Sequence, residues 1–473
     1  MARSAAAASL SPMRIGIVGG GAAAVALLDS LAQLDALPGT VTVFEPSTHL
    51  WGGRPYGPDL EVVLVNSPPV IMSIRHGDQR HYARWLGERA AAHLDERLGE
   101  PLVPRALYGE YLRQAAEEAA ARLPVDVQHG RVTGVERRGG EVVLRTADGH
   151  GQAVDRVVLC VGSGTPRDHF GLAGTPGYVA DPYPLARTLP GVPRESAVAV
   201  IGSGLTAVDV VVSLAAVGHT GPISLLSRSG VLPHVWQRPV RYEPRHLTAA
   251  NLRGARTTGD LAGLMRAELD GLGEDFDAFA ADLLATPAED PVVRLRRQIA
   301  AIDAPDLGRR ILQQAAHTLG PLAWSLLTDR AQLAGEHYRT AVSVSSPMVP
   351  VNAVQFDRLL ERGQLTLVRD LRTVEPSSPG FRIRAAGGSL RADVVVNAVN
   401  PPPHSVPPAA APLVASLLST GLATANPAGG LDVPSGAPLH VVGDLAAGGT
   451  FVTSSIPAIA ARAAATAQAL LSD

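Results

Sequence analysis

The chain has 473 residues, which is too long for one ordinary domain and favours two or three. A hydrophobic content of 46% and a charged content of 18% are typical of a globular protein with a large core. The formal net charge is -3 at pH 7, so no overall field would recruit nucleic acid or an anionic membrane.

The scarcity of two residue types, lysine and cysteine, excludes two kinds of enzyme chemistry. All 41 basic residues are arginine, so no lysine can form a Schiff base. Cys160 is the single cysteine, which excludes a redox-active cysteine pair within the chain. The histidines show no zinc spacing, and no metal site is expected. A signal peptide and a long apolar run are also missing from the sequence, which predicts a cytoplasmic protein without a membrane span.

The predicted elements begin with a strand, MRIGIVGG, a helix and a second strand, VTVFEP, which form a βαβ unit. A second βαβ unit starts at SAVAVIGSGLTAVDVVVSLAAVG and continues through PISLLSRSG. Between and after these units, the sequence predicts helices at 79–98 and 105–122, strands at 126–137, 141–146, 156–162, 364–372, 380–385 and 393–399, and a helical segment at about 245–337.

The first glycine-rich turn, Gly19 to Ala24, fits the G-x-G-x-x-A fingerprint between a strand and a helix. Gly19 permits the tight turn, Gly21 lets the backbone approach a pyrophosphate, and Ala24 lets the helix pack closely on the strand. Glu45 ends the next strand, where a carboxylate can accept both ribose hydroxyls of a dinucleotide. This combination predicts an FAD site.

The second glycine-rich turn contains Gly202, Ser203, Gly204, Leu205 and Thr206 and fits the same fingerprint. The strand after it ends in Ser227 and Arg228 where an NAD site would carry an acid. Because an arginine and a hydroxyl suit a 2′-phosphate, this turn is expected to bind NADPH rather than NADH.

The end of the chain carries a third signal. Gly443 and Asp444 close the strand LHVVGD, and an aspartate there can hydrogen-bond the ribityl chain of a flavin. The following segment, GGTFVTSSIPAI, contains Thr453 and Ser455 and enters a helix whose N-terminus is expected to face the isoalloxazine ring.

Together these segments resemble the two-dinucleotide-binding flavoproteins, and among them the NADPH-dependent monooxygenases such as the lysine and ornithine N-hydroxylases. A bacterial FAD-NAD(P)-binding family that includes nitrosuccinate-forming aspartate N-monooxygenases is a closer resemblance. The resemblance implies bound FAD, NADPH as hydride donor, and Asn66 and Met72 in the flavin pocket. It is carried by GGRPYG (52–57), LVNSPPVIMS (64–73), PRALYGEYL (104–112), VVLCVGSGTP (157–166), GSGLTAVD (202–209), SRSGVLPH (227–234) and DVVVNAVN (393–400).

The predicted fold is α/β, with two Rossmann-like dinucleotide-binding domains and a helical insertion. The FAD-binding domain is expected to be discontinuous, at 1–185 and 345–473, and the NADPH-binding domain to cover 186–344. Besides the turn residues and Glu45, the FAD site is expected to include Pro46, Gly53, Asn66, Met72, Gly162, Gly443, Asp444, Thr453 and Ser455.

Three polar residues are the candidates for the catalytic site: Asn66, Asn400 and Ser73. Asn400 stands where the family carries a glycine, which puts the transfer of a relative's substrate in doubt. Among the arginines near these loops, one that faces the pocket could hold a substrate carboxylate, and the sequence does not say which of them does so. They are Arg54, Arg75, Arg238 and Arg241.

The expected function is an FAD-dependent, NADPH-consuming monooxygenase that N-hydroxylates a small, amino-acid-like amine in secondary metabolism. The alternatives are another FAD/NADPH oxidation, by S-oxygenation or amine dehydrogenation, and a non-catalytic flavoprotein redox sensor. The expected partners are a small-molecule substrate and molecular oxygen, with no nucleic acid and no membrane, and a homo-oligomer stays open.

Overall fold

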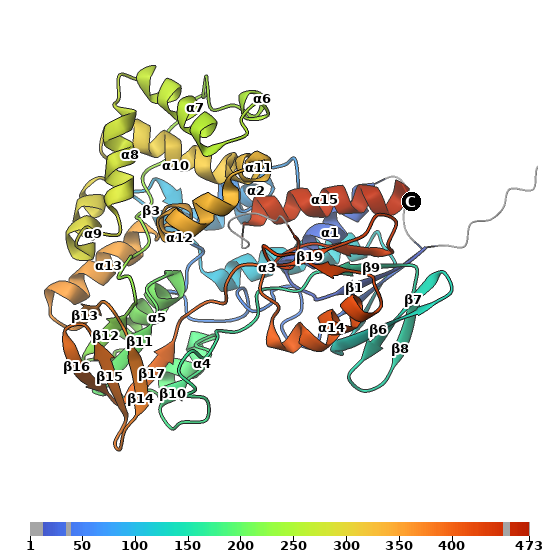
Figure 1. Cartoon of the computed structure of the whole chain (residues 1–473), viewed down its shortest axis with the longest axis horizontal. Helices are drawn as coiled ribbons and strands as arrows, with labels where there is room; N and C mark the ends of the chain where they lie inside the picture. Colours follow the sequence, from blue (N-terminus) through green and yellow to red (C-terminus); the bar gives the residue numbers. More distant parts are fainter. Residues whose placement is uncertain (1–12, 35–38, 448–454, 473) are drawn as a thin grey trace, which may run out of the picture.

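The computed structural model describes residues 13–34, 39–447 and 455–472. Two five-stranded sheets dominate the fold, each built around one of the glycine-rich turns. Figure 1 shows the first sheet with its helices on the right, the second sheet at the lower left, and a group of helices at the upper left.

The first sheet is parallel throughout, with the strand order β20-β9-β1-β2-β5. Four of the five residues of β1 are buried, so its apolar residues form a run rather than an alternation, as expected for a strand covered on both faces. The strands are β1 (Arg14–Val18), β2 (Thr40–Phe44), β5 (Val125–Gln128), β9 (Arg156–Leu159) and β20 (Leu439–Val441).

Three helices cover this sheet. α1 (Ala22–Ala32) packs against α3 (Arg105–Ala120) and α15 (Ile456–Ser472). Every residue of α1 after Ala22 is buried, and its alanines allow neighbouring helices to approach closely. An antiparallel sheet of β6 (Val132–Arg138), β7 (Glu141–Thr146) and β8 (Gly151–Val154) contacts α14 (Ala411–Ser419). The strand predicted at 126–137 is divided, because 125–128 form β5 of the first sheet and 132–138 form β6 of this one.

The second sheet is also parallel, with the order β10-β17-β11-β12-β13. Its core includes residues of α5 (Leu205–Ala216) and α13 (Pro350–Glu361). A small antiparallel sheet contains β14 (Thr373–Pro376), β15 (Phe381–Ala385) and β16 (Gly388–Ala392). The strands of the second sheet are β10 (Tyr178–Val179), β11 (Val198–Ile201), β12 (Ile223–Leu226), β13 (Leu365–Val368) and β17 (Val394–Asn397).

This topology corrects the expected domain boundaries. Residues 345–397 were assigned to the FAD-binding unit, but β13 pairs with β12 and β17 pairs with β11. β10, at 178–179, also joins the second sheet, so the crossing lies before 186. Parallel strands are joined by long crossover connections, so the strands that pair are far apart in the sequence. An apolar strand such as DVVVNAV therefore does not reveal which sheet it joins. Residues 178–397 therefore belong to the second unit.

The predicted helical insertion is confirmed as helical and extends to Ser345. Thr257 caps α7 in a capping box with Asp260, and Asp275 and Asp290 cap α8 and α9 through their side chains. The helices are α6 (Ala249–Leu252), α7 (Thr258–Asp270), α8 (Phe276–Ala285), α9 (Pro291–Ala300), α10 (Gly308–Thr318), α11 (Gly320–Leu326) and α12 (Arg330–Ser345).

Short elements connect the rest. The predicted helix at 79–98 is only partly present, because Gly87 ends α2 with a φ of +52° and a 3-10 helix follows. No helix within the described ranges is both long and apolar enough to cross a membrane. The short elements are η1 (Pro69–Ile71), α2 (His81–Leu86), η2 (Gly87–His93), β3 (Leu94–Asp95), β4 (Glu100–Pro101), α4 (Leu185–Thr188), η3 (Leu189–Gly191), η4 (Pro408–Ala410), β18 (Thr424–Ala425) and β19 (Leu431–Asp432).

Candidate active site

One large cavity, of about 1600 Å³, connects the three parts of the molecule. Its lining includes the first glycine-rich turn, the N-terminus of α5 after the second turn, and side chains of the helical insertion. Its size exceeds that of an ordinary small-molecule pocket, which suits two dinucleotides together with a substrate.

The first turn has the geometry that the fingerprint predicts. Gly19 has a φ of +104°, and a Cβ there would lie 2.6 Å from the carbonyl oxygen of Cys160, so only glycine fits. A Cβ on Gly21 would meet only the Cα of Gly53, at 3.7 Å. The protein's own packing does not require glycine at Gly21, and the space beside it is open to a pyrophosphate at the N-terminus of α1.

Glu45 lies at the end of β2 and lines the cavity. Its carboxylate accepts hydrogen bonds from the N–H groups of Gly20 and Ser47, both at 2.7 Å. Two bonds leave acceptor capacity on a carboxylate, so Glu45 can stabilise the turn and still accept ribose hydroxyls.

The cavity also brings together most of the other residues expected at the FAD site. Ala24 is fully buried in α1, which agrees with its packing role in the fingerprint. Thr453 lies outside the described residues. Those that line the cavity are Gly19, Gly21, Glu45, Pro46, Gly53, Asn66, Met72, Gly162, Gly443, Asp444 and Ser455.

The second turn repeats the first. Gly202 has a φ of +120°, and a Cβ there would lie 2.8 Å from the carbonyl oxygen of Ala398. A Cβ on Gly204 would meet no described atom within 4 Å, so the approach to this turn is open. Leu205 and Thr206 line the cavity, whereas Gly202, Ser203 and Gly204 lie outside its lining.

Of the two residues expected at a 2′-phosphate, only Arg228 is suitably placed. The Ser203 hydroxyl donates to the carbonyl of Val231 at 2.8 Å, so the Ser227 hydroxyl is the donor in its 3.0 Å contact with Ser203. Ser227 therefore has no proton left for a phosphate. Arg228 is exposed and lines the cavity.

His169, which was not among the site residues predicted from the sequence, lines the cavity near Arg228. Burial and the charges of Arg167 and Arg228 lower the pKa of His169. Arg167 and Arg228 come from loops after β9 and β12 and place positive charge near this edge of the cavity, whereas His169 is neutral there at pH 7. A conspicuous Arg-Asp-His run at 167–169 was the available signal.

Asn66 shows the contacts of a ligand-facing residue. Its side-chain oxygen is buried and has no hydrogen-bond partner among the described residues, and the residue lines the cavity. The indole N–H of Trp236 donates to the Asn66 carbonyl at 2.8 Å. Trp236 stacks in turn on His317 of α10, with ring centroids 4.4 Å apart. A buried amide oxygen without a partner is costly unless a ligand supplies the donor.

Ser73 is not part of the cavity lining, so the structure gives no support to the catalytic role expected for it. It is buried, and its hydroxyl donates to the carbonyl of Asp78 at 2.6 Å inside its own loop. A sequence pattern could not separate Ser73 from Asn66, because both lie in the same proline-bracketed loop and only the backbone path decides which one faces the cavity.

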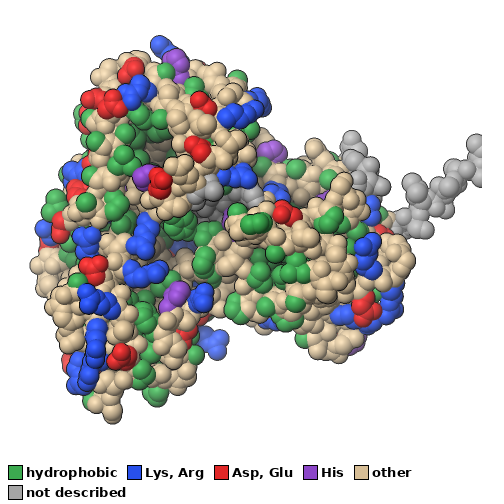
Figure 2. Space-filling model, viewed as in Figure 1, with side chains coloured by type: hydrophobic (Ala, Val, Ile, Leu, Met, Phe, Trp, Pro, Cys, Tyr) green, Lys and Arg blue, Asp and Glu red, His purple; other side chains and the backbone are tan. Residues whose placement is uncertain are grey.

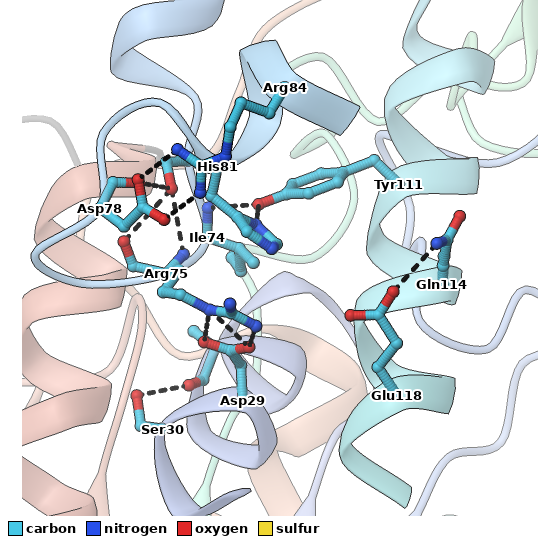
Figure 3. A network of polar contacts seen from close by, with 12 residues as sticks. Asp29, Ser30, Ile74, Arg75, Asp78, His81, Arg84, Tyr111, Gln114 and Glu118 are labelled. Atoms are coloured by element: carbon cyan, nitrogen blue, oxygen red, sulfur yellow. Dashed lines mark hydrogen bonds and ion pairs between the residues drawn. The ribbon is translucent and has the colours of Figure 1, made fainter. Parts of the chain in front are cut away.

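Side chains of α1 and α3 hold the loop that carries Asn66 and Met72, and Figure 3 shows the contacts of its continuation at 74–84. The Tyr108 hydroxyl donates to the Met72 carbonyl at 3.0 Å, and the N–H of Ile74 donates to the Tyr111 hydroxyl at 3.0 Å. Arg75 forms an ion pair with the buried Asp29 of α1 at 2.7 Å. These contacts hold the loop against α1 and α3 and assign Arg75 to the scaffold.

His81 completes this network. Its Nδ1 lies 2.8 Å from the Tyr111 hydroxyl. Burial and the charge of Arg75 lower the pKa of His81. The neutral ring therefore accepts a hydrogen bond from the Tyr111 hydroxyl, and that hydroxyl accepts one from the Ile74 N–H. Figure 3 shows that His81 and Tyr111 approach from opposite sides, from α2 and α3.

Asn400 lies where the chain leaves the second sheet after β17. It is exposed within the cavity lining, and its side-chain oxygen accepts a hydrogen bond from the Thr206 hydroxyl at 3.2 Å. Its position links the second turn to the returning chain, so a substrate or nicotinamide role for its amide group stays a prediction.

A buried ion pair joins the two units. The Arg105 guanidinium donates to Asp209 of α5 at 2.6 Å, and the Tyr183 hydroxyl donates to the same carboxylate oxygen at 2.5 Å. The Asp209 side chain is fully buried. Burial raises the pKa of Asp209, and the charge of Arg105 opposes that rise. Arg105 and Tyr183 line the cavity, so this pair fixes its wall at the junction of the units.

Arg54 and Arg238, two of the other candidate arginines, have structural contacts. Arg54 lines the cavity and forms an ion pair with Asp181 at 2.5 Å across the junction. Arg238 donates to the carbonyls of Glu96 and Arg97. No group of three or more metal-ligating side chains occurs in the part of the chain that the structure describes.

The comparisons with known proteins agree with this architecture. A model of an FAD-NAD(P)-binding family matches residues 16–164, which contain the first turn. No curated protein matches the sequence.

Several solved structures share the fold over nearly the whole chain. An L-lysine 6-monooxygenase from Pseudomonas syringae is similar with a TM-score of 0.57 and 17% identity, over 98% of this chain and 99% of that one. An ornithine N-hydroxylase from Kutzneria sp. 744, solved with reduced FAD, NADP+ and L-ornithine, gives 0.58 and 14% over 98% and 100%. A bacillithiol disulfide reductase from Bacillus cereus gives 0.51 and 13% over 98% and 99%.

The predicted fold class is therefore confirmed: the chain has an α/β fold with two parallel sheets, which it shares with these solved structures. The fold alone does not select the reaction, because monooxygenases and a disulfide reductase share it.

Proposed function

We propose that this protein is an FAD- and NADPH-dependent monooxygenase that N-hydroxylates the amine of a small molecule. The observation that carries the proposal is one large cavity that is lined by the first glycine-rich turn, by Leu205 and Thr206 after the second, and by side chains of the helical insertion. The balanced reaction is R–NH2 + O2 + NADPH + H+ → R–NHOH + H2O + NADP+. The N–O bond forms, the O–O bond breaks, and NADPH supplies two electrons.

The residues of the first unit fit FAD. The open space beside Gly21 would accept the pyrophosphate, Glu45 would accept the ribose hydroxyls, and Asp444 would hydrogen-bond the ribityl chain. The unpartnered side-chain oxygen of Asn66 is placed to accept a hydrogen bond from the flavin or the nicotinamide. When bound, FAD accepts a hydride from NADPH and, once reduced, reacts with oxygen.

The residues of the second unit fit NADPH. Leu205 and Thr206 present the N-terminus of α5 to the pyrophosphate, and Arg228 with its electropositive surroundings suits the 2′-phosphate. The insertion helices line the same cavity, and most of the side chains that they contribute to it are apolar.

The disulfide reductase alternative lacks support in this chain. Cys160 is the single cysteine and is buried, and burial raises its pKa well above that of a reactive thiol. A reductase that acts through a cysteine pair therefore has no second thiol here. The redox-sensor alternative does not account for a cavity that connects the second dinucleotide turn with the first.

Oxygen labelling tests the proposal directly. The FAD-loaded protein is supplied with NADPH, labelled dioxygen and a panel of amines, sulfides and amino acids, and the products are weighed by mass spectrometry. We expect one labelled oxygen atom on nitrogen. Label on sulfur, or an imine without label, would replace N-hydroxylation by S-oxygenation or dehydrogenation.

A further inference from the structure

Residues 245–345 form one part of the cavity lining, which we call the roof. None of the described roof residues that line the cavity is an arginine, an aspartate or a glutamate. Most are apolar, and they come from several insertion helices, for example Leu261, Met265, Leu283, Leu284, Trp324 and Tyr338.

This apolar lining does not reflect a lack of charge in the insertion. Its charged side chains pair with one another away from the cavity: Arg266 with Asp277 at 2.6 Å, and Arg297 with Glu289 at 2.8 Å. Figure 2 shows apolar side chains around a hollow in the upper-left lobe, with charged groups on the surrounding surface. The insertion helices are therefore amphipathic: their apolar faces line the cavity, and their charged side chains lie away from it.

Large apolar side chains remain exposed inside the roof. Leu284 is 56% exposed and Tyr338 is 37% exposed, although both line the cavity. Apolar surface that stays uncovered in a concave site indicates a ligand that covers it.

The roof is continuous with the cofactor site. Tyr338 of α12 and Asp444 line the same cavity, and burial and, to a smaller extent, the charge of Asp444 raise the pKa of Tyr338. His317 of α10 stacks on Trp236, which donates its indole N–H to the carbonyl of Asn66. A molecule under the roof therefore extends toward the expected position of the flavin.

His317 is a polar group of the roof that is linked to Asn66 through Trp236. It lines the cavity, and its Nε2 has no hydrogen-bond partner among the described residues. Burial lowers the pKa of His317 to about 4, so the ring is neutral at pH 7. A neutral imidazole can exchange hydrogen bonds with a neutral amine, but it offers no charge to a carboxylate.

Resting on the proposed function, we propose that the substrate is an amine with an uncharged, apolar body, aliphatic or aromatic, rather than a free amino acid. The body lies under the roof, and the amine lies beside Asn66 and His317. Burial among the apolar side chains of the roof disfavours the ammonium form, which leaves the nitrogen lone pair available to accept oxygen. The same surroundings penalise a substrate carboxylate, because the roof has no arginine to pair with it.

A chain-length series tests this substrate class. The FAD-loaded protein is assayed with butylamine, hexylamine and octylamine, and with lysine, ornithine and aspartate, for NADPH consumption and for hydroxylamine product. Because each buried methylene strengthens binding, we expect kcat/KM to rise about fourfold per methylene until the roof is filled. We expect the amino acids to be at least about 100-fold poorer.

The outcomes separate this inference from the proposed function. A free amino acid as the preferred substrate, or no dependence on chain length, would overturn the inference while leaving the monooxygenase intact. Absence of oxygenated product from every amine, or of flavin reduction by NADPH, would instead remove the proposed function.

A matched pair of variants locates the effect in the roof. Ala316→Arg places a charge on the cavity side of α10, and Ala278→Arg makes the same change on an exposed face of α8 outside the lining. For hexylamine we expect kcat/KM to fall about tenfold or more in Ala316→Arg and to stay within about twofold in Ala278→Arg. Equal effects of the two changes would contradict the inference.

A second roof variant covers the case in which Ala316→Arg does not fold. Ala316→Phe fills space without adding charge, so we expect it to shift the optimum to a shorter amine by about two methylenes or more. An unchanged optimum in a variant that retains FAD would also contradict the placement of the substrate under the roof.

Discussion

The Arg105 guanidinium donates to the buried carboxylate of Asp209 at 2.6 Å, and this contact joins the N-terminus of α3 in the first unit to α5 in the second. The other oxygen of that carboxylate is buried without a partner among the described residues. The ion pair therefore fixes the first unit against the second, and this contact requires both Arg105 and Asp209.

Removing either partner should destabilise the protein. We expect Arg105→Ala and Asp209→Ala each to lower the free energy of unfolding by about 3–5 kcal/mol, because each leaves the other charge buried and alone. The double variant should lose clearly less than the sum of the two. Urea unfolding of the FAD-loaded proteins measures this, and additive losses would show that the pair is not coupled.

Arg228 should decide the choice between the two nicotinamide cofactors. We expect Arg228→Ala to raise the KM for NADPH about 10- to 100-fold, since a charge-assisted contact to phosphate is lost, and to change the KM for NADH less than about twofold. The control Arg358→Ala removes an exposed arginine of α13 in the same unit. Equal changes for the two cofactors would show that Arg228 does not bind the 2′-phosphate.

Glu45 should control FAD retention. We expect Glu45→Ala to weaken FAD binding about tenfold or more, because it removes the carboxylate that accepts from Gly20 and Ser47 and is placed to accept from the ribose. Equilibrium dialysis or the FAD content after purification reports the change. Glu117→Ala, on an exposed face of α3, is the control. Full FAD retention by Glu45→Ala would contradict the assignment of the first turn.

Glu268 gives a prediction of pH dependence. It is buried; burial alone would raise its pKa, but hydrogen bonds from the Tyr242 hydroxyl and from three N–H groups at 245–247 outweigh burial and lower the pKa to about 2. A lowered folded-state pKa gives stability that is complete above the unfolded pKa of about 4.3 and is lost as the pH falls toward 2.

We therefore expect Glu268→Gln to cost roughly 3 kcal/mol at pH 7 and progressively less below about pH 4. Unfolding of the two proteins across this pH range measures the difference. A gap that stays constant with pH would show that the ionised carboxylate does not hold the segment at 245–247.

The sequence predicted the parts of this protein that local chemistry determines. Gly19 and Gly202 are recognisable because a strand, a turn with positive φ and a helix follow one another within a few residues. Glu45 and Arg228 follow at the ends of the next strands. The parallel sheets and the helical insertion were also predictable from apolar runs and from helical periodicity.

Non-local contacts account for what the sequence did not predict. β17 joins the second sheet through Val198 and Val394, which are far apart in the chain, so the domain boundary was misplaced. His317 reaches Asn66 only through Trp236, and Arg105 meets Asp209 only after both units have folded. Each of these pairs consists of ordinary residues without a motif, and only the packed structure brings them together.

Anaerobic mixing of the FAD-loaded protein with NADPH, followed by oxygen and an apolar amine, tests whether one cavity holds both dinucleotides. We expect rapid loss of the oxidised-flavin absorbance with NADPH, slower loss with NADH, and return of the band with oxygen together with one equivalent of hydroxylamine per NADPH. A flavin that stays oxidised in the presence of NADPH would contradict this expectation, because the cavity would then not bring the two dinucleotides together.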